Sequence, residues 1–365
     1  MITTLPIKQI IFALLFISCT VLSAQESATT DTLEKAIKTP IALPDFDTST
    51  TIFQKIMQDS FFEVVLKTNF DTLIKNKKIS RKKYAGTILF KNASGETFKT
   101  KVKIEPRGRS RRKYCNSMPP LKIDFPKKAL DNLGLYPGAD KLKLVTNCND
   151  NETSDQVLMK EYWIYKLYNE ITPESFQVFP VKITYVDTDN PDDKIIRHAF
   201  FIESNEELSL RLNGELVSLF GTRPDMIKTN SYHNTLLFQY MIGNLDWDIT
   251  VGRNVKLLKT PNSEKYTLVP YDFDFSGLVK APHARLNPDY GQKNIEERFP
   301  QGKFASKEAL HTTIDQFNSH KKAGFNCFNQ CSTLSKGEKK KMHRYLGSFY
   351  KLLRDKPYLE ELFLE

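Results

Sequence analysis

Acidic residues at both ends of a short apolar β segment most constrain what this chain can fold into. An apolar helical pattern over 232–242 leads into a loop, and two apolar strands, 255–258 and 266–269, then read as a hairpin. Polar residues flank that hairpin: Asp246, Asp248 and Asn254 precede it, and Asp272 and Asp274 follow it. Because a hairpin returns the chain to where it started, we expect these side chains to gather at one end of it.

These residue types, in this order, are those that phosphoryl transfer needs. A carboxylate orients the attacking hydroxyl, and an Asn with an Asp holds Mg²⁺ or Mn²⁺ against the phosphates. Protein kinases place the base and the Asn on one loop and return the metal-binding Asp on the next hairpin. We therefore assign Asp246 as the catalytic base. The metal ligands would then be Asn254, Asp272 and Asp274. Asp248 is an alternative base, and a calcium site or a metal-hydrolase centre is an alternative interpretation of the acidic group.

A helix with one carboxylate on its apolar face precedes this segment. Residues 155–170 have helical periodicity, and Glu161 lies in the middle of the apolar face. A lone carboxylate is costly to bury, so Glu161 needs a cationic partner, and the arginines of 107–112 are candidates. Strand patterns surround this helix, whereas the later part of the chain is mainly helical. We therefore predict an α+β fold, β-rich over 56–203 and mainly helical over 204–365.

Five short stretches, taken in order, resemble the CotH family of atypical, protein-kinase-like proteins. They are RGRSRRKYCNSMPPLKIDF (107–125), DQVLMKEYWIYKLYN (155–169), GNLDWD (243–248), RNVKLL (253–258) and VPYDFDFSG (269–277). The match covers roughly residues 60–300 and depends on the order of the stretches rather than on any one of them. The resemblance implies a two-lobed kinase-like fold without the usual Gly-rich phosphate loop, and this sequence contains no G-x-G-x-x-G either.

The resemblance also implies roles for individual residues. Lys122 would be the strand lysine that contacts ATP phosphates, and Glu161 would be its partner in a buried ion pair. Arg107 and Arg109 would donate to phosphate oxygens. Glu203 would lie at the hinge between the lobes. The implied activity is the transfer of phosphate from ATP, with Mg²⁺ or Mn²⁺, to hydroxyl groups of proteins.

The N-terminus has the layout of a secretory signal peptide. A short basic region precedes the apolar run 10–17, and small residues follow, up to a cut site after Ala24. We predict a signal peptide over 1–24, a polar linker over 25–55 and an extracytoplasmic location. A lipid anchor at Cys19 is the alternative to a freely released protein. No later segment is apolar enough to cross a membrane.

The basic charge of the chain favours anionic partners. The net charge is +10, from 53 basic and 43 acidic residues, which favours phosphates, acidic polymers or lipid headgroups. Aromatic residues do not alternate with the basic runs, so we do not expect nucleic-acid binding.

Four cysteines follow the signal peptide: Cys115, Cys148, Cys327 and Cys331. An even number in an exported chain predicts disulfides. Cys327 and Cys331 are close enough in sequence for a local bridge, which leaves Cys115 with Cys148. A zinc site is the alternative, although the cysteines lack the tight spacing of zinc ribbons.

We interpret the chain as an exported, CotH-like kinase that acts on a protein at the cell surface or in secretions. The alternative is a kinase-like binding module for adhesion or envelope assembly, whose acidic pocket binds metal without turnover. The scarcity of ATP outside the cytoplasm favours the module. The joint presence of Lys122, Glu161, Asp246, Asn254 and Asp272 favours the enzyme.

We predict that the exported protein begins near Gln25, because the apolar run and the small residues before it match a cleavage site. N-terminal sequencing of the protein from a secreting host tests this. Recovery of a cytoplasmic protein that keeps Met1 would contradict it.

Overall fold

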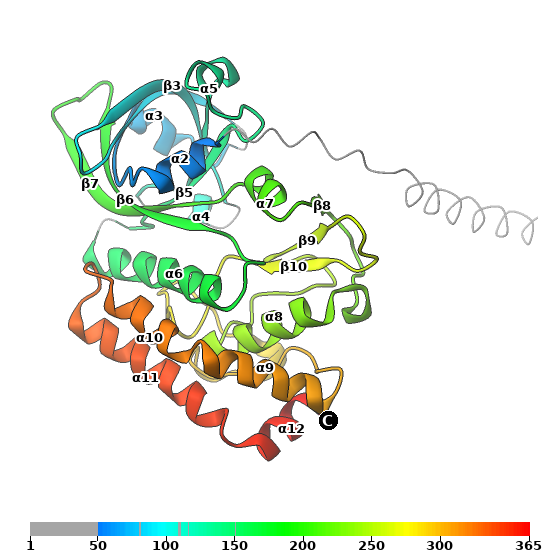
Figure 1. Cartoon of the computed structure of the whole chain (residues 1–365). Helices are drawn as coiled ribbons and strands as arrows, with labels where there is room; N and C mark the ends of the chain where they lie inside the picture. Colours follow the sequence, from blue (N-terminus) through cyan, green and yellow to red (C-terminus); the bar gives the residue numbers. More distant parts are fainter. Residues whose placement is uncertain (1–49, 80–81, 109–110, 116, 150) are drawn as a thin grey trace, which may run out of the picture. The chain divides into compact units, whose positions relative to one another are not determined.

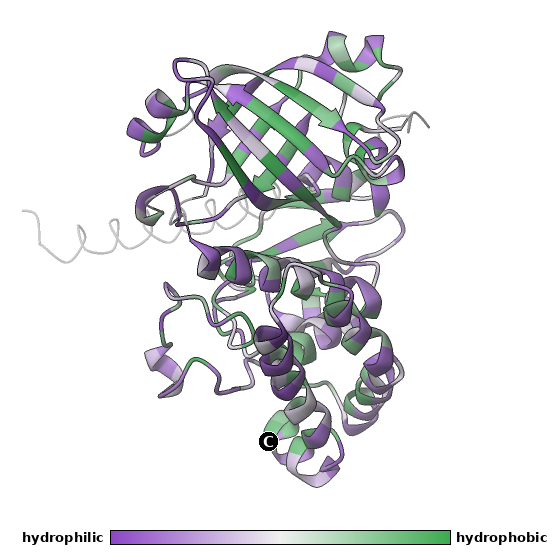
Figure 2. Ribbon diagram, turned by 90° about the vertical axis from the view of Figure 1, so that its left-hand side faces the viewer, coloured by the Kyte–Doolittle hydropathy of each residue, from purple (hydrophilic) through white to green (hydrophobic). Residues whose placement is uncertain are grey.

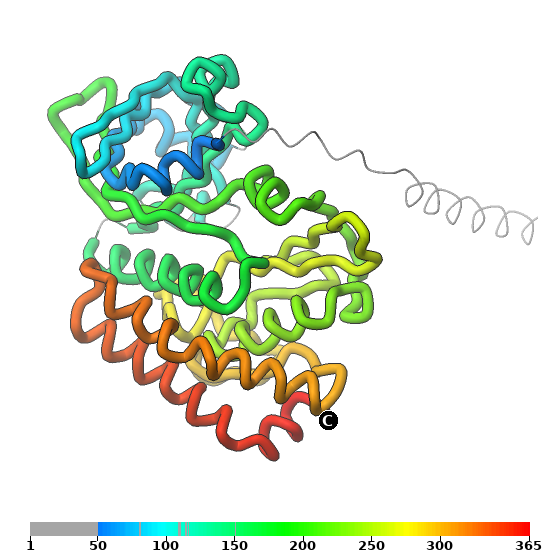
Figure 3. Tube along the Cα trace, viewed as in Figure 1, coloured from blue at the N-terminus to red at the C-terminus, as the bar shows by residue number. Residues whose placement is uncertain are grey.

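The computed structural model describes residues 50–79, 82–108, 111–115, 117–149 and 151–365. The predicted signal peptide with Ala24, the lipid-anchor candidate Cys19 and Arg109 lie outside these residues, as does most of the predicted linker. Figure 3 follows the described chain from a β-rich beginning to the helices at its end.

Seven strands of the described residues close into a barrel, in the order β1-β2-β3-β4-β5-β7-β6 (Figure 1). Neighbouring strands are antiparallel, except that β1 and β6 pair in parallel and complete the closure. The strands are β1 (Glu63–Thr68), β2 (Tyr84–Lys91), β3 (Thr97–Pro106), β4 (Leu121–Asp124), β5 (Lys141–Val145), β6 (Val178–Asp187) and β7 (Lys194–Ile202).

Alternating side chains separate the inside of the barrel from its outer face. In β4, Leu121 and Ile123 are fully buried, whereas Lys122 points to the outer face. Figure 2 shows this alternation as bands of opposite hydropathy along the strands. Three short helices add apolar residues to the same core: α2 (Ile52–Gln58), α3 (Phe70–Lys75) and α5 (Lys127–Asn132). Helix α2 therefore begins inside the segment that we predicted as a linker.

Helix α6 (Glu152–Ile171) lies between the barrel and the helical part of the chain (Figure 1). Asn151 caps its first turn by accepting a hydrogen bond from Ser154 N–H. The helix contacts β6 and β7 along one side and α8 (Thr229–Ile242) and α10 (Lys321–Asn329) along the other. This double contact explains why most of the helix from Leu158 onward is buried, Glu161 included.

The helical part packs around α8 (Thr229–Ile242), which is almost wholly buried. Beside α8 lies a three-stranded antiparallel sheet in the order β10-β9-β8. The other elements here are α7 (Asn205–Arg211), β8 (Glu215–Val217), β9 (Val255–Lys259), β10 (Thr267–Pro270), α9 (Lys307–Ser319), α10 (Lys321–Asn329), α11 (Lys336–Leu352) and α12 (Lys356–Leu364). A second hydrophobic core joins these elements to α6.

The predicted mixture of helices and strands is confirmed, and the predicted hairpin is β9 and β10. Closure of the barrel was not predicted. It depends on the parallel pairing of β1 with β6, two strands that are far apart in the sequence. Periodicity indicates which residues form strands, but it does not indicate such a distant partner.

Of the two predicted disulfides, one is confirmed and one is wrong. Cys115 and Cys148 are bridged, with their Cα atoms 4.4 Å apart. Cys327 and Cys331 are free and buried. Cys327 lies within α10, whereas Cys331 lies beyond its end with its Sγ 3.0 Å from the Thr333 hydroxyl, so that the sulfurs pack in different surroundings.

Among the described residues, no helix is both long and apolar enough to span a membrane.

Burial of His233 predicts a loss of stability in acid. Its Nε2 accepts a hydrogen bond from Ala305 N–H (3.1 Å), and burial lowers its pKa to about 4. The unfolded chain takes up this proton near pH 6.5, so the contribution of His233 to stability is present above that pH and is lost as pH falls toward 4.

The urea midpoint of wild type should therefore fall more steeply between pH 7 and pH 4.5 than that of His233→Gln, whose amide oxygen can accept the same hydrogen bond without titrating. Parallel curves for the two proteins would contradict this prediction.

Candidate functional site

The loop after α8 is fixed against the segment that follows β10. Gly243 caps α8 with a left-handed φ of 65°, and a Cβ atom there would lie 2.1 Å from the Tyr345 hydroxyl oxygen. Only glycine combines that φ with so close an approach. Gly277 N–H donates to the Gly243 carbonyl oxygen (3.0 Å). The two acidic segments are thereby held side by side, as the hairpin predicts.

Asp246 and Asn254 contact each other directly. Nδ2 of Asn254 donates to the backbone oxygen (2.7 Å) and to Oδ2 (2.9 Å) of Asp246. Burial raises the pKa of Asp246, and Arg253 opposes that effect. Asp248 is engaged elsewhere, since its Oδ1 accepts from two backbone N–H groups of its own turn (2.6 and 3.1 Å). Of the two candidate bases, Asp246 is therefore the one that contacts Asn254 through its side chain.

Asp272 and Asp274 have different environments. Asp272 has a left-handed φ of 63°, and its N–H donates to the Tyr165 hydroxyl oxygen (2.8 Å). Its carboxylate is partly exposed, whereas Asp274 is buried with its Oδ2 2.8 Å from His283 Nε2. Loss of water around the carboxyl group, followed by the charge of Asp274, raises the pKa of Asp272. Burial acts in the same sense on Asp274, but Arg111 and His283 together outweigh it and hold that pKa well below its usual range.

Arg111 joins three acidic residues in this site. It comes from the short helix α4 (Arg111–Tyr114), and its Nη2 lies 2.6 Å from Glu161 Oε2 and 2.8 Å from Asp274 Oδ2. Asp272 Oδ1 is farther away, at 3.9 Å. Burial disfavours the charge of Arg111, but attraction by Asp274 and Glu161 raises its pKa well above the ordinary value.

The predicted ion pair between Lys122 and Glu161 is wrong. Lys122 Nζ lies 2.6 Å from Glu105 Oε2, and its side chain is 29% exposed. The physical reason is the strand register, which places Glu105 of β3 directly opposite Lys122 of β4 on the outer face of the barrel. Glu161 takes its cation from Arg111 instead, one of the arginines that the sequence left open.

A second lysine, Lys143, lies directly opposite Lys122 on the neighbouring strand. Lys143 of β5 donates to Asn205 Oδ1 (2.7 Å) beside the start of α7. Burial, followed by the charge of Arg107, lowers the pKa of Lys143 to about 7. Burial also lowers the pKa of Arg107, while Asp272 attracts its charge. Arg107 and Lys143 are thus two half-buried cations near each other, and Arg107 is the one whose charge Asp272 attracts.

Sequence reasoning missed Lys143, the specific role of Arg111 and the contact of His283. A signal existed for Lys143, because it stands in the alternating run KLKLV, the last strand before α6. For His283 we see no signal, because only the folded loop brings it to Asp274.

Glu203 follows β7 directly and is almost fully buried. Its carboxylate accepts from Arg211 (2.8 and 3.0 Å) and from Gln177 N–H (3.0 Å). These contacts satisfy the carboxylate within the protein and tie α7 to the start of β6. No contact of Glu203 points to a ligand.

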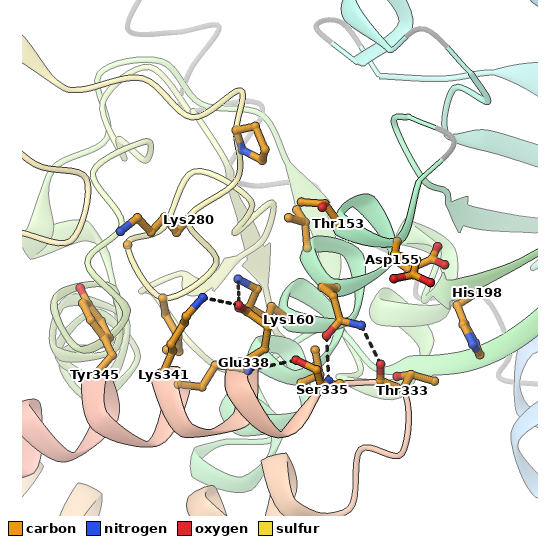
Figure 4. A pocket seen from close by; sticks show the side chains of 18 of the residues that line it. Thr153, Asp155, Lys160, His198, Lys280, Thr333, Ser335, Glu338, Lys341 and Tyr345 are labelled. Carbon is orange, nitrogen blue, oxygen red and sulfur yellow. Dashed lines mark hydrogen bonds and ion pairs between the residues drawn. The ribbon is translucent and has the colours of Figure 1, made fainter.

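Cavities adjoin both ends of the acidic site. One of about 250 Å³ is lined by Arg111, Glu161 and His283, and one of about 230 Å³ is lined by Asp246 and Arg253. A larger cavity of about 780 Å³ lies between α6 and α11, and none of these acidic residues lines it. Figure 4 shows it, with Lys160 bound to Glu338 (2.8 Å) at its floor. Within the described residues, no group of three or more His, Cys, Asp or Glu side chains is arranged to hold a metal.

No protein-family model and no curated protein matches this chain. Among solved structures, it is similar to the crystal structure of a Helicobacter pylori proinflammatory kinase, CtkA. That match covers 69% of this chain and 92% of the other, with 9% identity and a TM-score of 0.39. A similarity this low carries no argument about fold or activity.

Glu161→Ala should destabilise the protein far more than Lys122→Ala. Loss of one partner from a buried ion pair costs about 3–5 kcal/mol, and the lower end is expected because Asp274 still pairs with Arg111. Lys122 and Glu105 are a more exposed pair, worth about 1 kcal/mol or less. Urea unfolding of both variants measures the difference. Equal losses in the free energy of unfolding would show that the pair of Glu161 with Arg111 contributes no more than the exposed pair.

Proposed function

We propose that this chain is an atypical, CotH-like protein kinase that transfers phosphate from ATP to protein hydroxyl groups outside the cytoplasm. One observation carries the proposal: Asp246 and Asn254 are in contact just before the β9–β10 hairpin, Asp272 follows it, and the half-buried Arg107 lies close enough to be attracted by Asp272, with Lys143 next to Arg107. A base, oxygen ligands for a cation and a basic surface for phosphates are the parts that phosphoryl transfer needs.

The oxygen donors fit a hard cation such as Mg²⁺ or Mn²⁺. Nδ2 of Asn254 is turned to Asp246, which leaves its Oδ1 available as a ligand. Asp272 offers a partly exposed carboxylate whose distance to Arg111 Nη2 is long, at 3.9 Å. A bound cation would supply positive charge against the phosphate oxygens. Asp274 is committed to Arg111 and His283, so we assign Asp272 rather than Asp274 as the main ligand.

The basic pair Arg107 and Lys143 would bind the triphosphate. Lys143 stands on the last strand before α6, and it takes the role that the resemblance implied for Lys122. Burial, followed by the charge of Arg107, lowers the pKa of Lys143, and the negative charge of a phosphate would favour its protonated form. Arg107 can donate to phosphate oxygens in the bidentate manner typical of arginine.

Asp246 would orient the acceptor hydroxyl and take its proton. The hydroxyl oxygen forms the new bond to the γ-phosphorus while the bond from that phosphorus to the β–γ bridging oxygen breaks, and ADP leaves with the bonding electrons. Asn254 holds the Asp246 side chain in place, and the raised pKa of Asp246 suits proton transfer. The cavity at Asp246 and Arg253 offers room for the acceptor.

Two further features support an exported kinase-like protein. The Cys115–Cys148 disulfide is typical of oxidising compartments and accords with the signal peptide pattern. The β-rich part ahead of a mainly helical part, with α6 between strands, follows the element order of protein kinases. The partner would be a secreted or surface protein, and Cys19 would serve if the chain is lipid-anchored.

A kinase-like binding module without turnover is the second candidate. Arg111 already pairs with Asp274 and Glu161. A module that binds without turnover could hold its acidic residues together by the same internal ion pairs.

Three Asp→Asn variants separate these functions. Asp246→Asn should keep Mn²⁺–ATP binding but lower phosphate transfer about 10²–10⁴-fold, because only the base is lost. Asp272→Asn should lose metal-dependent nucleotide binding as well. Asp248→Asn is the matched control and should behave as wild type, because an amide oxygen can still accept from its turn.

Thermal shift with and without Mn²⁺–ATP measures binding, and self-labelling from ATP measures transfer. Labelling of wild type that Asp246→Asn retains would contradict the assigned base. Binding without any labelling by wild type would favour the module.

A further inference from the structure

The guanidinium of Arg111 lies where an acidic site would otherwise hold a cation. Its Nη2 is within 2.8 Å of both Glu161 Oε2 and Asp274 Oδ2, and Nε adds a third contact to Asp274 Oδ2 (3.1 Å). The side chain is only 15% exposed, and that of Glu161 is 3% exposed. These are strong, charge-assisted contacts in a poorly solvated place.

We propose that Arg111 is a built-in cation that takes one of two cation positions in this site, so that the protein binds a single divalent ion. This inference rests on the proposed function, in which Asp272 and Asn254 receive that ion. Conventional protein kinases use two divalent ions in the same task. Here Arg111 supplies the second positive charge permanently, because a guanidinium does not lose its proton in proteins.

The contacts of the carboxylates support a single free position. Asp274 Oδ2 is shared by Arg111 and His283, and the Glu161 carboxylate is fully buried against Arg111. A divalent ion bonds carboxylate oxygens at about 2.0–2.6 Å, so it would have to displace the guanidinium to use them. Asp272 is 3.9 Å from Arg111 and keeps its oxygens open.

The backbone holds Arg111 at this position. Its carbonyl oxygen accepts from Cys115 N–H (2.9 Å), and Cys115 is bridged to Cys148 in the segment between β5 and α6. Ser117 N–H donates to the Cys148 carbonyl oxygen (3.2 Å). Helix α4 is thus fastened next to the helix that carries Glu161, and a divalent ion cannot easily push it aside.

The test counts Mn²⁺ ions by electron paramagnetic resonance of the free ion, in the presence of a non-hydrolysable ATP analogue. Wild type should bind one ion per chain. Arg111→Met keeps the length of the side chain but removes its charge, and it should bind two. Arg111→Lys keeps the charge and is the control that should bind one. Mn²⁺ should also raise the melting temperature of Arg111→Met more than that of wild type.

The difference between variant and wild type tests Arg111, whereas the wild-type count tests the proposed function. One ion in both proteins, or two in wild type, overturns the built-in cation and leaves the kinase proposal standing. No ion in wild type but one in Arg111→Met supports the built-in cation and contradicts the kinase proposal. No ion in either protein contradicts both.

A charge-balanced variant covers the case in which Arg111→Met does not fold. Arg111→Met with Glu161→Gln removes one cation and one anion, and it leaves Asp272 and Asp274 free to share an ion. It should bind one more Mn²⁺ than wild type. An unchanged count would overturn the proposal.

Discussion

The ion pairs of Arg111 are the contact on which the rest of the site depends. Glu161 and Asp274 come from α6 and from the segment after β10, and each is buried. Two neighbouring buried carboxylates without a cation would be strongly unfavourable, so Arg111 allows these elements to approach. The cation comes from a third element, α4, which the Cys115–Cys148 disulfide fastens beside α6. One side chain therefore links the barrel, the long helix and the acidic hairpin.

The charges around this contact are arranged in a way that suits a phosphate ester. Asp246, Asn254 and Asp272 supply oxygens at the hairpin end, Arg107 supplies positive charge near Asp272, and Lys143 lies near Arg107. Asn254 and Asp272 both adopt left-handed backbone conformations, which are unusual outside glycine and concentrate at functional sites. The hydrogen bond from Asp272 N–H to the Tyr165 hydroxyl ties that conformation to α6.

Local patterns predicted the parts of the site, and tertiary pairing decided their partners. The hairpin with its flanking acids, the buried Glu161 and its need for a cation all follow from periodicity and desolvation. The sequence does not predict which cation pairs with Glu161, because that depends on where the strand with Lys122 and the helix with Arg111 lie in the folded chain. The strand register pairs Lys122 with Glu105, whereas Lys143 on the next strand contacts Asn205 and lies near Arg107. The barrel closure, the free Cys327 and the contact of His283 likewise depend on residues that meet only in the folded chain.

The central claim is that Mg²⁺–ATP or Mn²⁺–ATP binds where Asp272 and Asn254 face Arg107 and Lys143. A crystal structure with Mn²⁺ and a non-hydrolysable ATP analogue, with anomalous data collected for manganese, tests it most directly. The account predicts a manganese peak at Asp272 and Asn254, with the triphosphate along Arg107 and Lys143. Manganese elsewhere, or nucleotide in the cavity between α6 and α11, would contradict it.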